Sequence, residues 1–141
     1  MDYDTIPAAS FGQSLRGIGL NLLTRDVRRE VAFLTATFGM LAHRVSDDFA
    51  ILIHNGVPLQ LHADATYHSH PLPGLLPEAG PRGAGAELRL YDTDPDTAAA
   101  RAEPAGGSIL QPPADKPHGL REAYILSPDG YCWVPSRARH P

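Results

Sequence analysis

The chain contains an internal repeat, which limits the possible folds more than any other feature of the sequence. Two aspartates that can start helices, Asp26 and Asp94, lie 68 residues apart. The glycines of two hairpin turns, Gly56 in Asn-Gly and Gly130 in Pro-Asp-Gly, lie 74 residues apart, and both turn sequences are strong hairpin signals. One longer loop in the second copy accounts for the difference. The repeat therefore indicates two copies of one supersecondary unit that bury their apolar faces together.

Each copy has the pattern of a β-α-β-β-β module. In the first, an apolar strand at 17–23 precedes a helix that Asp26 can cap and Gly39 can end, and the apolar residues between them recur at helical spacing. A short strand at 42–45 and the hairpin at 49–62 follow. The second copy repeats this order with expected strands at 87–91, 108–110, 122–126 and 131–134, a helix at 97–102 and a loop at 111–119.

We therefore predict an α+β fold in which two tandem β-α-β-β-β modules form one curved eight-stranded mixed sheet around a cavity, with the helices outside. Residues 1–15 are expected to be an N-terminal tail, and residues 16–138 a single domain. Within that domain, module one spans 16–64, a linker rich in Pro, Gly and His spans 65–83, and module two spans 84–138.

The composition excludes several classes of protein. The 141 residues fit one domain, and no apolar run approaches the roughly 18 residues of a membrane span. The polar N-terminus lacks the apolar core of a signal peptide, so we expect a cytoplasmic protein without a membrane partner. A net charge of −4 without a block of Lys or Arg argues against a nucleic-acid partner. The single cysteine, Cys132, excludes an internal disulfide and a cysteine-based zinc cluster.

This order of elements resembles the vicinal oxygen chelate superfamily, which groups glyoxalase I, bleomycin-resistance proteins, fosfomycin-modifying enzymes and extradiol dioxygenases. The resemblance rests on a strand running into an Asp-started helix at 20–38 and on a strand-helix-Gly-Gly pattern at 87–107. The closing strand, Pro-Asp-Gly turn and strand at 122–134 complete it. The resemblance covers roughly residues 16–136 and implies the paired-module fold predicted above.

The resemblance also implies where a metal would bind. In metal-using members four strand positions converge on one divalent ion, and the corresponding positions here are Gly19, Gln60, Glu87 and Val134. Gly and Val supply no side-chain donor, and one amide with one carboxylate is a poor set for a transition metal. We therefore expect no metal cofactor and assign no metal ligand. A divalent ion there, or a second site built from His62 with His68 or His70, remains an open alternative.

Strand alternation places further polar side chains beside those four positions. The resulting ligand-binding candidates are Asn21, Gln60, His62, Glu87, Arg89, Tyr91, Tyr124 and His118. His62 and Glu87 are also the candidates for acid–base catalysis. Glu87 and Arg89 either form a structural ion pair or act separately, with Arg89 gripping an anion. Alternation also leaves two choices for the strand before the last turn: Glu122 and Tyr124 face the cavity, or Ala123 and Ile125 do.

These residues and the resemblance lead to a functional hypothesis. We expect a metal-free small-molecule binding protein, similar to the bleomycin-resistance branch, that sequesters a polar or anionic compound. That branch commonly forms its cavity between two chains, so the resemblance implies a homodimer. The alternatives are a lyase, isomerase or dioxygenase with an altered or absent metal set, and a structural or regulatory subunit with a vestigial pocket. His43, His54 and His140 are expected at the surface.

Overall fold

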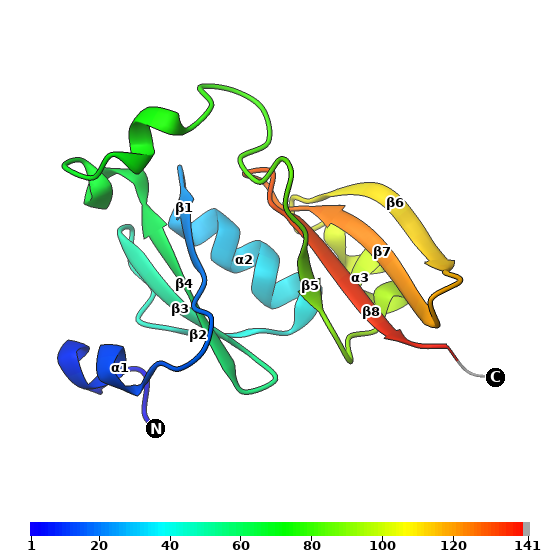
Figure 1. The fold of residues 1–141 in the computed structure, drawn as a ribbon, viewed down its shortest axis with the longest axis horizontal. Coiled ribbons are helices and arrows are strands. Elements are labelled where there is room, and N and C mark those ends of the chain that lie inside the picture. Colours follow the sequence, from blue (N-terminus) through cyan, green and yellow to red (C-terminus); the bar gives the residue numbers. More distant parts are fainter. Residues whose placement is uncertain (140–141) are drawn as a thin grey trace.

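Residues 1–139, which the computed structural model describes, form two four-stranded sheets with a helix packed on one face of each (Figure 1). The expected surface position of His140 lies outside the described residues. The α+β class and the two β-α-β-β-β modules are confirmed. The prediction of a single eight-stranded sheet is not confirmed, because no strand pairing within the described residues joins one sheet to the other. No helix within residues 1–139 is long and apolar enough to cross a lipid bilayer.

The first sheet has the strand order β1-β4-β3-β2. Its elements are β1 (Asn21–Thr24), α2 (Val27–Phe38), β2 (Leu41–His43), β3 (Phe49–His54) and β4 (Val57–Ala63), and β1 runs parallel to β4. The predicted helix ends are confirmed. The side chain of Asp26 accepts a hydrogen bond from the backbone N–H of Arg29, and Gly39 closes the helix with a φ of 70°.

The second sheet repeats this order as β5-β8-β7-β6. Its elements are β5 (Leu88–Leu90), α3 (Pro95–Ala102), β6 (Ser108–Asp115), β7 (Leu120–Leu126) and β8 (Cys132–Ala138). Strand β6 corrects the sequence prediction, because it continues through most of the expected loop at 111–119. Pro112 and Pro113 are accommodated because β6 is an edge strand whose register shifts twice along β7.

Apolar side chains fill the space between each sheet and its helix. Leu52 and Leu61 from the first sheet and Trp133 from the second are almost fully buried in one cluster with Phe33 of α2. Both helices lie behind the sheets in Figure 1. The opposite face of each sheet carries the alternate side chains, and we call it the open face.

The two modules are joined at the Pro-Asp-Gly turn of the second module. The buried carboxylate of Asp129 accepts a hydrogen bond from the backbone N–H of Arg25 at 2.9 Å and forms an ion pair with the Arg25 guanidinium. The carboxylate of Glu30, on α2, accepts from the backbone N–H of Asp129 at 2.6 Å. Tyr131 completes the joint by donating to the carbonyl of Leu23 at 2.6 Å. The turn is therefore a structural contact between modules as well as a hairpin.

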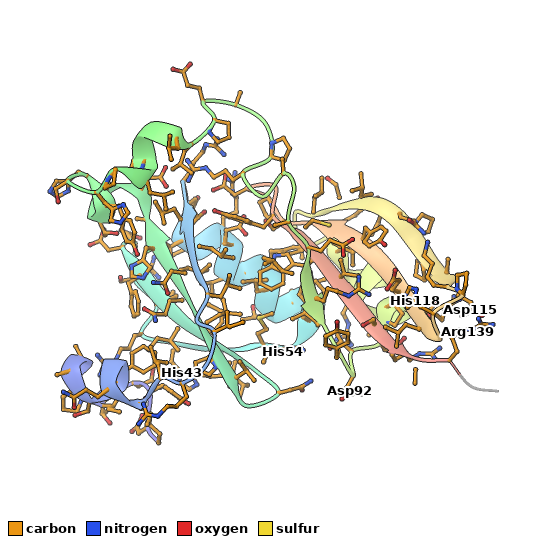
Figure 2. The ribbon with its side chains drawn as sticks, in the orientation of Figure 1. His43, His54, Asp92, Asp115, His118 and Arg139 are labelled. Carbon is orange, nitrogen blue, oxygen red and sulfur yellow. The ribbon has the colours of Figure 1, made fainter. Side chains whose placement is uncertain are left out.

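The N-terminal residues expected to be a tail are ordered against the first sheet. Residues Ala8–Ser14 form helix α1, and Phe11 is buried in a cluster with Ile51 and Ile53 of β3. His43, expected at the surface, is half-buried beside this segment (Figure 2), and its Nδ1 lies 3.0 Å from the Oδ2 of Asp4. Between the modules, the linker contains two short 3-10 helices, η1 (Asp64–Tyr67) and η2 (Leu72–Leu75).

Candidate functional site

The open face of the second sheet gathers most of the predicted ligand-binding residues. Arg89 of β5 is opposite Val134 of β8 in the strand register, and Glu122 of β7 is opposite Ser136. Because β7 alternates, Tyr124 lies on the same face as Glu122. The choice left open by the sequence is thus resolved, since Ala123 and Ile125 belong to the core behind the sheet.

Glu122 is the centre of a hydrogen-bonded network on this face. Its side chain is only 2% exposed, and its Oε2 forms an ion pair with Arg89 and lies 3.4 Å from the Nε2 of His118. Its Oε1 accepts from the Tyr124 hydroxyl at 3.0 Å. Arg89 also donates to Glu87 at 3.0 Å, so one guanidinium serves two carboxylates. Of the two alternatives for Glu87 and Arg89, the structure contains the ion pair, and Glu122 joins it as a third charged residue.

The pKa directions agree with this network. Burial raises the pKa of Glu122, but the hydrogen bonds from Arg89 and Tyr124 outweigh it and leave that pKa below its ordinary value. Burial lowers the pKa of Arg89, but the bonds to Glu122 and Glu87 raise it above its ordinary value. The Glu122 carboxylate accepts a hydrogen bond from the Tyr124 hydroxyl, and this bond raises the pKa of that phenol above its ordinary value. All three groups therefore keep their ordinary charges at neutral pH.

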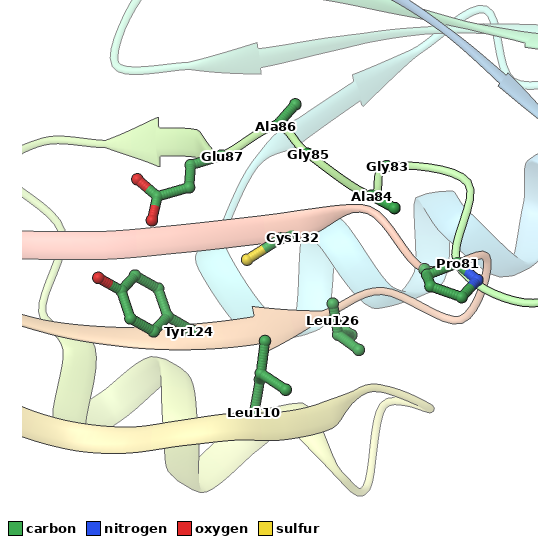
Figure 3. A pocket seen from close by; sticks show the side chains of 11 residues that line it. Pro81, Gly83, Ala84, Gly85, Ala86, Glu87, Leu110, Tyr124, Leu126 and Cys132 are labelled. Carbon is green, nitrogen blue, oxygen red and sulfur yellow. The ribbon is translucent and has the colours of Figure 1, made fainter.

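Two hollows meet at Glu87. One, of about 440 Å³, lies over the open face of the second sheet and is lined by Leu110, Tyr124, Leu126 and Cys132 with the approach segment 81–86 (Figure 3). The other, of about 470 Å³, is a groove between the modules, lined by Leu20 and Leu59 on one side and by residues 87–92 on the other. Glu87 lines both. Together they form a largely apolar space, with the exposed carboxylate of Glu87 where they meet and that of Asp92 further along the groove.

The groove also contains an unused hydrogen-bond donor. Trp133 lines it and is 1% exposed, yet among the described residues its indole N–H has no acceptor. A buried donor without a partner destabilises a protein unless a ligand or water accepts from it. His54, expected at the surface, is half-buried at one end of the groove and hydrogen-bonds the hydroxyl of Thr93 at 2.9 Å. Figure 2 shows His54 at this end of the first module.

The predicted residues of the first module do not join this space. Asn21 and Gln60 are paired neighbours on the first sheet, and His62 follows on the same face. None of the three is among the described residues that line the two hollows around Glu87. His62 instead packs between Phe49 and Tyr67 in tilted ring contacts, with ring centroids 5.1 and 5.2 Å away. Burial lowers its pKa, so the ring is neutral at pH 7.

The residues at the four family metal positions do not fit a metal ion. Gly19 has no side chain, Val134 is fully buried, and the carboxylate of Glu87 is bonded to Arg89. The side-chain oxygen of Gln60 and the Oε1 of Glu87 are the oxygens left at these positions, which are too few for a transition metal. Within residues 1–139, no three His, Cys, Asp or Glu side chains cluster in a way that would hold an ion.

Two of the residues that shape the site were missed or left undecided by the sequence analysis. Glu122 was one of two alternatives, and the register that pairs Leu126 with Cys132 would have selected it. Trp133 was not considered. As the single tryptophan, placed beside a predicted cavity position, it could have been singled out from sequence.

Comparison with known proteins identifies the family. The family model described as the Glyoxalase/Bleomycin resistance protein/Dioxygenase superfamily matches residues 18–134. The chain belongs to this superfamily. The resemblance recognised from the repeat is therefore confirmed. A search of curated proteins finds no match.

Solved structures of superfamily members share this fold. A glyoxalase/bleomycin resistance protein/dioxygenase family enzyme from Burkholderia phytofirmans is 20% identical, with a TM-score of 0.70 over 85% of this chain and 96% of its own. A glyoxalase/bleomycin resistance protein/dioxygenase from Nocardioides is 25% identical, with a TM-score of 0.63 over 92% and 89%. The fosfomycin resistance protein FosX from Mesorhizobium loti is 12% identical, with a TM-score of 0.62 over 89% and 94%. At these identities the likeness supports the fold, and the chemistry depends on the residues of this chain.

Proposed function

We propose that this superfamily member is a metal-free small-molecule binding protein. The observation that carries the proposal is the pair of hollows that meet at Glu87, at a place where the residues offer too few metal ligands. Their combined space is of the size and apolar character typical of small-molecule sites. The ligand that fits has an apolar body, with a polar or positively charged group near Glu87.

The sequence led us to expect a polar or anionic compound, and a positively charged group departs from the anionic part of that expectation. Arg89, which was expected to grip an anion, donates to both Glu87 and Glu122, so the three groups together carry one negative charge. The pKa of Cys132, in the same hollow, is raised by burial and by the negative charge of Glu87. Among the described residues that line this space, the one arginine or lysine is Arg89, which is committed to two carboxylates. An anionic group would therefore be repelled there, whereas an ammonium group would be attracted.

Among the enzyme alternatives, one that works without a metal needs an acid–base pair, for which Glu87 and His62 were the candidates. Glu87 accepts a hydrogen bond from Arg89 on the second sheet, whereas His62 packs between two aromatic rings on the first sheet. This separation favours binding over acid–base catalysis. The homodimer remains part of the proposal. Exposed Leu110 and Tyr91, at the edges of the two hollows, are apolar surface that a second copy would cover.

A matched set of probes tests the proposed ligand chemistry. Naphthylethylamine, naphthylethanol and naphthylacetate share one apolar ring system and differ in charge. By fluorescence titration at low salt, we expect the amine to bind about fivefold more tightly than the acetate, because a partly exposed carboxylate contributes about 1 kcal/mol. Glu87→Gln should weaken this preference, because it removes the charge that both hollows share and leaves the carboxylate of Asp92 in the groove alone.

Glu103→Gln is the matched control, since Glu103 is an exposed carboxylate at the end of α3, outside both hollows. It should leave the preference unchanged. Absence of binding by all three probes, or equal preference in the wild type and Glu87→Gln, would reject the proposed ligand. Near-stoichiometric Ni, Zn, Fe or Mn in protein purified without an affinity tag or added metal would reject the metal-free hypothesis.

A further inference from the structure

The N-terminal segment lies on the open face of the first sheet. Strand register places Ile51 opposite Gln60 and Phe49 opposite His62, so these apolar and polar side chains share one face. Phe11 packs on this face against Ile51 and Ile53, with Tyr3, Ile6 and Leu15 around it. The segment thus covers an apolar surface directly beside two predicted ligand-binding residues.

A small set of polar contacts fastens this segment to the end of β2. The carboxylate of Asp4 accepts from the backbone N–H of Arg44 and contacts Nδ1 of His43, each at 3.0 Å. The guanidinium of Arg44 donates to the carbonyl of Tyr3 at 2.8 Å and to that of Ile6. Figure 2 shows His43 where the segment meets the sheet. Asp4 and Arg44 together are called the latch.

The segment itself is weakly held. Helix α1 has seven residues, and its N-cap is Pro7, whose side chain cannot accept a capping hydrogen bond. Helices this short are unstable alone, so α1 depends on its packing, and Phe11 is its one buried residue within the described chain. Arg44 has a φ of 51°, a conformation unfavourable for a residue with a side chain, and it adopts this conformation where it grips the segment.

We propose that residues 1–15 form a displaceable lid, held by the latch, that controls access to the open face of the first sheet. When the lid opens, Phe49, Ile51 and Ile53 become an apolar surface beside Gln60 and His62. This surface suits an aromatic or aliphatic ligand that is uncharged, because burial keeps His62 neutral. The inference concerns the first sheet and does not depend on the ligand proposed for the second.

Asp4→Ala tests the latch, and Asp2→Ala is its matched control. Asp2 is an aspartate of the same segment, but its carboxylate serves only the local turn, accepting from the backbone N–H of Asp4. The readouts are the rate of tryptic cleavage after the exposed Arg16 and the fluorescence of anilinonaphthalene sulfonate, a dye that binds apolar surface. Asp4→Ala should raise the cleavage rate about tenfold, the effect of losing charge-assisted hydrogen bonds, with a matching rise in bound dye.

Asp2→Ala should change both readouts at most about twofold, as expected for a surface substitution. Arg44→Gly should act like Asp4→Ala while relieving the positive φ, so loss of the guanidinium is separated from backbone strain. If both latch variants cleave and bind dye like the wild type, the segment is a fixed part of the core and the lid is rejected.

Discussion

Replacing Glu30 by Gln should stabilise the protein at neutral pH. Glu30 is 1% exposed at the joint between the modules, and its Oε2 is buried without a partner among residues 1–139. Burial raises its pKa from 4.5 to about 7, against the lowering effect of bonds from Ser127 and Asp129. Gln keeps the oxygen that accepts from the Asp129 backbone N–H, and its amide nitrogen can donate to Ser127.

The pH dependence follows from the sign of this shift. Between pH 4.5 and about 7, Glu30 ionises in the unfolded chain but stays protonated in the folded protein, so its contribution to the free energy of unfolding falls as pH rises. The full difference corresponds to about 3 kcal/mol and is reached above pH 7. Asp129 has a lowered pKa, so its contribution to the free energy of unfolding is lost as pH falls at more acidic pH. This contribution is the same in the wild type and in Glu30→Gln.

Urea denaturation from pH 4.5 to pH 8 measures this effect. The free energy of unfolding of Glu30→Gln relative to wild type should increase across the window and level off above pH 7. The exposed Glu103→Gln, on α3, should show a constant difference near zero. A difference between Glu30→Gln and wild type that does not change with pH would contradict the proposed burial of this carboxyl.

Two further predictions concern the second module. Arg89→Leu should destabilise the protein by about 3 kcal/mol at pH 7, because it leaves the buried Glu122 carboxylate without its cation. The loss should be smaller near pH 4, where Glu122 becomes protonated. Urea denaturation at the two pH values checks this. Gly107→Ala should destabilise by about 2 kcal/mol, because the added Cβ would collide with Phe33, whereas Gly12→Ala has open space and should be neutral or stabilising in a thermal melt.

Local chemistry was readable from the sequence. The helix caps at Asp26 and Asp94 each depend on one side chain and a backbone N–H two or three residues away, so both could be predicted and both are present. The repeat of these local signals then gave the module order. The superfamily followed from that order, because the relation between two similar modules restricts how the chain can fold.

Contacts between distant residues were not readable in the same way. The lid forms because Phe11 meets Ile51 and Ile53, about forty positions later, and nothing in the local pattern of the segment announces this partner. The charge of the site depends on Arg89 reaching across β8 to Glu122 on β7. From the sequence, Arg89 looked available for an anion, because its second partner depends on the register of β7.

The two prolines of β6 have a consequence for solubility. Strand β6 is eight residues long, lies at the edge of its sheet and exposes Leu110, which together describe a surface that invites pairing with another chain. Pro112 and Pro113 lack the backbone N–H that such pairing requires, and the irregular register bends the edge away from a flat template. The residues that made this stretch look like a loop thus protect an exposed strand against aggregation.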